Sequence, residues 1–159
     1  MNAKKTIMKR STIAKTLTIA AVTVLALGVA PTAKADDKGC SNVDVKGTFV
    51  YTGTGSINPP SPAAGPFVEV GTQIFDGKGG TTFAAMASQN GNIRQMTGTG
   101  TYTVNPDCTG TMTLQVSPTF SVQVFFVIAD WGNEFLAIET NPGLVITRTA
   151  RRMFPGRAI

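Results

Sequence analysis

Residues 36–159 are built from short runs of β-branched and aromatic residues that Gly, Pro, Asn and Asp divide, and no run has the apolar period of a helix. This pattern is typical of strands joined by turns. It predicts eight strands, over residues 47–52, 67–75, 80–89, 92–105, 111–116, 120–129, 134–140 and 144–153. Residues 36–159 make up 124 of the 159 residues, and 124 residues is the size of one domain.

The connections between these strands are too short for crossover helices. Asp76–Gly79 and Asn90–Gly91 are tight-turn signals, whereas residues 57–66 contain four prolines and form a longer loop. Sequential antiparallel pairing is therefore expected. We predict an all-β fold, a single antiparallel eight-stranded up-and-down barrel, because eight strands close around side chains or one small ligand. A two-sheet β-sandwich is the alternative.

The alternation within strands assigns residues to faces. Val68, Val70 and Ile74 share one face of their strand, and Glu69 and Gln73 share the other. Phe125 and Val127 make the outer face of residues 120–129 apolar. Two explanations stay open for that apolar face: a partner, oligomer contact or covering loop on the barrel exterior, or a central strand that the Pro-rich loop or the C-terminal tail covers.

Residues 1–35 have the pattern of a cleaved signal peptide. Basic residues precede the uncharged 14-residue run from Leu17 to Ala30, and small residues lead to a cleavage point between Ala35 and Asp36. A 14-residue helix reaches about 21 Å, less than the roughly 30 Å hydrocarbon core of a bilayer. We therefore expect export to the periplasm or the extracellular space, with no stable membrane span after cleavage.

Removal of the leader changes the charge balance. Six of the 14 basic residues lie in the leader and all nine acidic residues follow it, so eight minus nine gives the mature chain a net charge of −1. The formal charge of +5 for the whole sequence thus belongs to the leader. No binding of nucleic acid is expected, because the mature chain lacks a basic surface. The basic tail of Arg151, Arg152 and Arg157 is interpreted as a solvated terminus.

The two cysteines, Cys40 and Cys108, both follow the predicted cleavage point. An exported chain meets an oxidising compartment, so a disulfide bond between them is expected. It would close a loop of about 69 residues and stabilise the fold by roughly 4 kcal/mol on the chain-entropy model.

The sequence contains no histidine, which excludes Ser-His and Cys-His nucleophiles and metal sites that need imidazole. We predict no catalytic, cofactor-binding or metal-binding residues. Two pairs of ionisable side chains are the candidate exceptions. Asp130 and Glu134 flank a turn and are interpreted as solvated. Glu69 and Arg94 would orient a polar ligand if both lay in a barrel mouth, but their alternation with apolar neighbours predicts that they face outward.

The turns and the cysteine pair form a set of motifs, at residues 40–49, 65–71, 75–79, 100–110 and 140–152. Together these motifs resemble those of a group of small exported bacterial proteins of uncharacterised function, which have an outline similar to calycin or allene-oxide-cyclase-like barrels. The resemblance covers nearly the whole mature domain and implies its fold. It implies no activity, because no catalytic residue of the cyclase matches a position here.

The function expected from these observations is that of an exported, non-catalytic β-barrel protein that binds a small apolar ligand. Small inward residues, Gly98, Gly100 and Ala84 or Ala85, are expected to leave space for it. A structural, self-associating envelope protein is the alternative, and a histidine-free isomerase or cyclase is a third. The sequence leaves the oligomeric state open.

Overall fold

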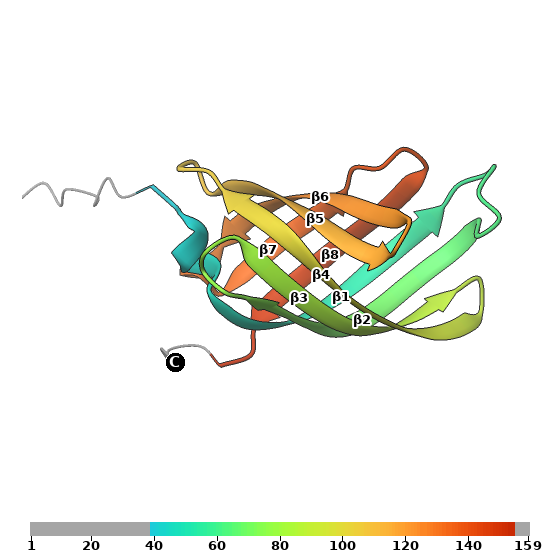
Figure 1. The fold of residues 1–159 in the computed structure, drawn as a ribbon, viewed down its shortest axis with the longest axis horizontal. Coiled ribbons are helices and arrows are strands. Elements are labelled where there is room, and N and C mark those ends of the chain that lie inside the picture. The colour runs from blue at the N-terminus through green and yellow to red at the C-terminus, as the bar shows by residue number, and fades with distance from the viewer. Residues whose placement is uncertain (1–38, 155–159) are drawn as a thin grey trace, which may run out of the picture. The chain divides into compact units, whose positions relative to one another are not determined.

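The chain forms a closed antiparallel barrel of eight strands (Figure 1). The computed structural model describes residues 39–154; the predicted leader, its cleavage point at Ala35 and Asp36, and Arg157 lie outside the described residues. The strands are β1 (Gly47–Ile57), β2 (Gly65–Phe75), β3 (Gly80–Gln89), β4 (Asn92–Val104), β5 (Thr109–Ser117), β6 (Phe120–Ala129), β7 (Glu134–Glu139) and β8 (Leu144–Arg152).

Each strand pairs with its neighbours in sequence, and β8 pairs with β1 to close the barrel. This confirms the up-and-down barrel over the two-sheet sandwich. Strand β1 is the element that differs most from its prediction, because it continues to Ile57. Its second half is rich in glycine, which normally weakens a strand. Here a Cβ on Gly55 would collide with the backbone of Val145 on β8, so glycine permits the close pairing that seals the barrel.

One end of the barrel, the closed end, is filled by aromatic side chains. Phe75 contacts Tyr102, Phe49 and Phe135 in edge-on geometry, with ring centroids 4.9, 5.6 and 5.7 Å apart. Phe49 and Phe126 also pack on Phe135. All five rings are buried, so the closed end is a packed core.

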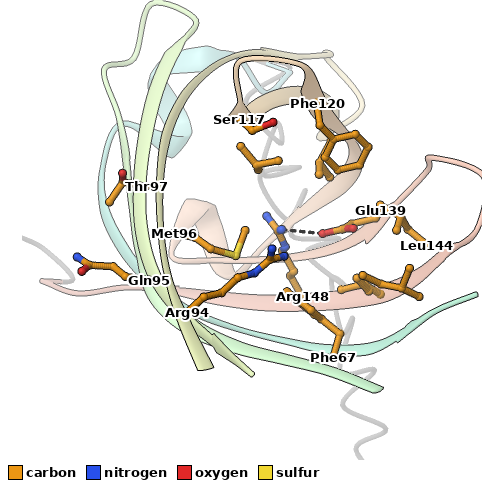
Figure 2. A pocket seen from close by; sticks show the side chains of 14 residues that line it. Phe67, Arg94, Gln95, Met96, Thr97, Ser117, Phe120, Glu139, Leu144 and Arg148 are labelled. Atoms are coloured by element: carbon orange, nitrogen blue, oxygen red, sulfur yellow. Dashed lines mark hydrogen bonds and ion pairs between the residues drawn. The ribbon is translucent and has the colours of Figure 1, made fainter. Parts of the chain in front are cut away.

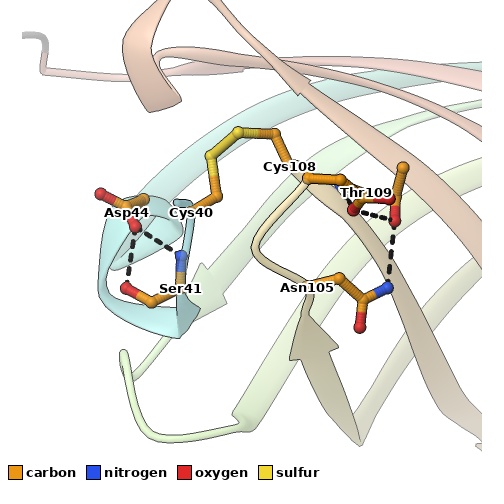
Figure 3. The surroundings of a disulfide bond; sticks show 7 residues. Cys40, Ser41, Asp44, Asn105, Cys108 and Thr109 are labelled. Atoms are coloured by element: carbon orange, nitrogen blue, oxygen red, sulfur yellow. Dashed lines mark hydrogen bonds between the residues drawn. A yellow bond between two sulfur atoms is a disulfide. The ribbon is translucent and has the colours of Figure 1, made fainter. Parts of the chain in front are cut away.

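A short 3₁₀ helix, η1 (Asn42–Val45), covers the closed end and is held there by a disulfide bond. Cys40 is bonded to Cys108 in the β4–β5 turn, with their Cα atoms 4.9 Å apart (Figure 3). This is the predicted disulfide. The Asp44 carboxylate accepts hydrogen bonds from the Ser41 backbone and hydroxyl, which caps the helix.

Arg152 fastens the same cap to the last strand. Its guanidinium donates to the backbone carbonyls of Lys46, Asp44 and Gly132 and lies 4.8 Å from the centroid of the Phe49 ring. The interpretation of this stretch as a solvated tail is wrong for Arg152, because strand β8 continues through that residue. Arg151, on the opposite face of the strand, is exposed.

The outer face predicted for Phe125 and Val127 on β6 is correct, whereas the expectation that Glu69 on β2 faces outward is wrong. Val68, Val70 and Ile74 are exposed on the barrel exterior, whereas Glu69 and Gln73 are buried inside it. The interior face of β2 also carries Phe67 and Phe75, and these rings supply the bulk that fills the barrel.

Phe125 and Val127 are exposed on the exterior, where they lie opposite Ile138 and Leu136 of β7. These four exposed side chains form an apolar patch on β6 and β7. The Pro-rich loop between β1 and β2 lines cavities at the other end of the barrel and leaves the patch uncovered. Among the described residues, no helix is long and apolar enough to cross a membrane.

Candidate functional site

The end of the barrel opposite the closed end contains a cavity of about 380 Å³, the mouth cavity (Figure 2). Its lining mixes eight apolar with six polar or charged residues and comes from seven of the eight strands, all except β3. The apolar lining includes Phe67, Met96, Val116, Phe120, Leu144 and Ile146.

Ionisable side chains lie between the mouth cavity and the aromatic core. This charged layer consists of Tyr51, Glu69, Glu139 and Arg148, from β1, β2, β7 and β8. Arg148 Nη2 donates a 2.6 Å hydrogen bond to Glu139 Oε1, and the Tyr51 hydroxyl donates a 3.3 Å bond to Glu69 Oε2. The side chains of Glu69, Glu139 and Arg148 are 0%, 2% and 6% exposed, so the layer is enclosed by the barrel.

Arg148 and Glu69 attract each other without an aligned hydrogen bond. Arg148 Nε lies 2.8 Å from Glu69 Oε1, the distance of a tight ion pair. The angle is unfavourable, so both atoms are buried without a hydrogen-bond partner. An unsatisfied buried polar atom costs free energy, and the Coulomb attraction of this pair offsets that cost. The Arg148 guanidinium also lies 5.4 Å from the centroid of the Tyr51 ring.

Gly53 on β1 allows this ion pair to form. It lies opposite Glu69 on β2 and opposite Arg148 on β8, so the two charged residues are separated by this one position. A Cβ at Gly53 would lie 2.7 Å from Glu69 Oε1 and 2.8 Å from its Cγ. The missing side chain is therefore the space in which the Glu69 carboxylate reaches Arg148.

The charged layer contains two carboxylates and one guanidinium. Burial raises the pKa of Glu69, and the Arg148 charge and the Tyr51 hydrogen bond oppose the rise. Burial also raises the pKa of Glu139, with the Glu69 charge acting in the same direction and Arg148 against it. Burial, reinforced by the Glu69 charge, raises the pKa of Tyr51, so its hydroxyl stays protonated. The layer therefore takes up a proton more readily than exposed carboxylates would.

The prediction that Glu69 and Arg94 face outward is wrong. Glu69 belongs to the charged layer, and Arg94 lines the mouth cavity (Figure 2). The outward prediction failed because the more aliphatic face of β2 was equated with the interior. Glu139, Arg148 and Tyr51 were not predicted as site residues. The signal available in the sequence was their position within the strand: Glu139 lies two residues from Ala137 and four from Phe135, so all three side chains point to the same, inward face of β7.

Asp130 and Glu134 lie at the closed end, away from the mouth cavity. Asp130 is exposed and begins η2 (Asp130–Gly132), and Glu134 faces Arg151 with 3.6 Å between Oε2 and Nε. An ion pair this exposed contributes little. These two carboxylates are therefore not brought into a site.

The glycines expected to leave space do not line the mouth cavity. A Cβ on Gly98 would lie 2.6 Å from the Phe83 ring, and one on Gly100 would lie 2.9 Å from a methyl group of Leu114. Larger neighbours thus occupy the space beside both glycines. Ala85 is part of the packed core, and Ala84 faces outward. The cavity arises instead where the strands end around Met96 and Leu144.

The described residues contain no group of three or more His, Cys, Asp or Glu side chains placed to hold a metal ion. Comparison of the chain with protein-family models, curated proteins and solved structures finds no match. The site is therefore interpreted from its own chemistry. It combines apolar side chains with charged groups at its base, which is a composition suited to a molecule that has both an apolar and a polar part.

Proposed function

We propose that this chain is an exported, non-catalytic β-barrel protein that binds a small, largely apolar molecule in the mouth cavity. The observation that carries the proposal is the cavity of about 380 Å³, in which eight apolar residues surround one side of the charged pair Glu139 and Arg148. Pockets of a few hundred Å³ with apolar walls and few polar groups are the usual form of small-molecule sites. The packed closed end gives this chamber a rigid base.

The arrangement of the carboxylates supports binding over catalysis. Glu69 is enclosed and committed to Arg148 and Tyr51, and one oxygen of Glu139 is committed to Arg148. A general acid or base must reach the proton that it transfers. Of the two buried carboxylates, Glu139 lines the cavity and Glu69 does not. The ion pair with Arg148 restrains the Glu139 side chain. The group therefore serves best as a fixed recognition element.

Export is supported by the leader pattern of residues 1–35 and by the disulfide, which is typical of oxidising compartments. The barrel topology also agrees with the calycin-like outline that the turn motifs resemble. We extend the proposal to membership of that group of small exported bacterial barrel proteins.

Mass spectrometry of protein recovered from its export compartment tests the proposal. The denatured mass is expected to correspond to cleavage after Ala35 and to the loss of two hydrogens in one disulfide. The native mass is expected to exceed it by the mass of a bound molecule, which can then be identified. A bare native mass, together with no uptake of apolar probes, contradicts the ligand-binding function.

A matched pair of variants locates the binding site. Leu144 lines the mouth cavity, whereas its neighbour Val145 is exposed on the exterior. Leu144→Trp fills the cavity and is expected to abolish binding of the co-purified molecule, and Val145→Trp is expected to preserve it. Equal binding by both variants would place the ligand elsewhere.

Self-association is a second candidate function, favoured by the apolar patch of Phe125, Val127, Leu136 and Ile138. Contiguous exposed apolar side chains of this kind occur at interfaces. Light scattering at high concentration is expected to detect dimers or larger species that Leu136→Ser disrupts and Val70→Ser, another exposed position, preserves. A monomer at every concentration rejects this candidate.

A further inference from the structure

Two arginines reach the mouth cavity from opposite parts of the chain. Figure 2 shows Arg94 of β4 and Arg148 of β8 extending into it beside Met96. The Arg148 charge lowers the pKa of Glu69, and the Arg94 charge acts in the same direction more weakly. Arg148 is neutralised by Glu69 and Glu139, so the positive charge at the cavity that has no ion-pair partner among residues 39–154 is that of Arg94.

Arg148 retains a free donor towards the cavity. Its Nε faces Glu69 and its Nη2 binds Glu139, and both of these nitrogens are thereby committed. Nη1 makes no hydrogen bond to the described residues and, in contrast to Nε, is not completely enclosed. The buried ion pairs fix the guanidinium plane, so Nη1 is presented in one orientation.

Arg94 is exposed to solvent and forms no ion pair with any residue between 39 and 154. The charged groups that line the cavity are thus two guanidinium groups and the Glu139 carboxylate, whereas Glu69 lies behind Arg148 and does not line it. The lining favours an anionic group over a cationic one. Arginine is also the side chain best suited to bind a planar oxyanion through paired N–H donors.

An apolar extension continues from this polar corner. A second cavity, of about 530 Å³, lies beneath the Pro-rich loop and shares Ile57, Phe120 and Leu144 with the mouth cavity. An elongated apolar body that starts beside Arg94 can follow these shared residues to the loop.

Resting on the proposed function, we propose that the ligand is an elongated apolar molecule with a single oxyanion head, such as a carboxylate. The head binds between the Arg94 guanidinium and Arg148 Nη1. The apolar body lies along Met96, Leu144 and Phe120 towards the Pro-rich loop.

Calorimetric titration with three ten-carbon probes tests this inference: decanoate, decan-1-ol and decylamine, which share one tail and differ in the head. Decanoate is expected to bind at least about tenfold more tightly than decanol, and decylamine the most weakly. Arg94→Gln is expected to weaken decanoate about tenfold while changing decanol less than about twofold. Arg151→Gln removes the same charge on the exterior and serves as the matched control.

Each outcome separates the two proposals. If decanol or decylamine binds as tightly as decanoate, or if Arg94→Gln and Arg151→Gln weaken decanoate equally, the oxyanion head is rejected and apolar binding stands. If none of the probes binds, both proposals fail. Raising the salt concentration is expected to weaken decanoate and to leave decanol unweakened, since only the charged head is screened.

Discussion

Gly53 shows how one missing side chain organises the barrel interior. It separates Glu69 from Arg148 across β1, and the Glu69 carboxylate occupies the volume that a Cβ would take. Because the neighbouring side chains are fully enclosed, the carboxylate has little room to move aside. The requirement for glycine is steric at this position, since the backbone there adopts an ordinary strand conformation.

Gly53→Ala is accordingly expected to lower the free energy of unfolding by about 1–3 kcal/mol, the usual cost of an extra methyl group in a packed interior. Urea denaturation measures the change. Thr54→Ala, at the adjacent exposed position, is the control and is expected to lose less than about 1 kcal/mol. Equal losses in the two variants would contradict the steric account.

The two buried carboxylates predict an unusual dependence of stability on pH. Their pKa values are raised above 4.5 by folding, so the native state binds more protons than the unfolded state. Their stabilising contribution is complete below pH 4.5 and is lost as pH rises through the folded pKa values. With no histidine in the chain, no other side-chain type ordinarily titrates between about pH 5 and 7.

The free energy of unfolding is therefore expected to fall as the pH rises above 4.5 in the wild type, and to fall less in Glu139→Gln. The variant leaves Glu69 and Arg148 as a balanced pair. Asp76 and Asp107 act oppositely, because hydrogen bonds from Lys78 and Thr109 lower their pKa values, but their effect lies below pH 3.8. Denaturation curves across this range provide the test, and parallel curves for the two proteins would refute it.

The sequence predicted only part of the arrangement of polar residues inside the barrel. Alternation correctly separated Glu69 and Gln73 from Val68, Val70 and Ile74. It could not say which set faces inward, because both faces of β2 carry apolar residues and the exterior tolerates aliphatic side chains. The ion pairs depend on the closure of β8 onto β1, which links residues far apart in sequence. Only the three-dimensional register brings Arg148 beside Glu69.

At the scale of elements, η1 is a cap whose attachment is mainly tertiary. Its disulfide reaches the β4–β5 turn, Arg152 binds its carbonyl groups, and the Asn42 side chain accepts a hydrogen bond from the Val104 backbone. A four-residue helix has no stability alone, so these contacts hold it in place.

Replacement of both cysteines, as Cys40→Ala with Cys108→Ala, is expected to destabilise the protein by up to about 4 kcal/mol, since the unfolded chain regains the entropy of a long loop. Thermal and urea unfolding measure the loss, and far-UV circular dichroism is expected to retain the strand signal because the barrel ladder is untouched. Unchanged unfolding midpoints would contradict the prediction. Thiol labelling of the unreduced wild type is expected to modify neither cysteine.

Strand boundaries were predicted best where turn chemistry is unambiguous. Strands β3 and β6 begin and end at the predicted residues. The second half of β1 was missed because Gly53 and Gly55 read as turn residues, although here they serve close strand contacts. The number and order of strands followed from short connections alone.

Across the whole molecule, the charged layer separates two unlike regions. The closed end has a continuous aromatic core, whereas the buried cluster at the mouth contains only Phe67, Ala87 and Ile146. Less buried apolar contact means a lower cost of local opening. Hydrogen exchange is therefore expected to be slowest for amides around Phe126 and Phe135 and faster around Leu144. Uniform protection along β6, β7 and β8 would contradict this division.

The separation of the aromatic core from the mouth cavity also affects which positions of the chain tolerate substitution. Most of the enclosed aromatic surface lies on one side of Glu69, Glu139 and Arg148, and the residues that line the mouth cavity lie mainly on the other. Met96, Val116 and Leu144 line the cavity and are only partly buried at the edge of the core. A library of apolar substitutions at these three positions should therefore yield more folded barrels than one at the buried rings, and is expected to alter binding of the proposed ligand. The closed end, in contrast, should accept few changes.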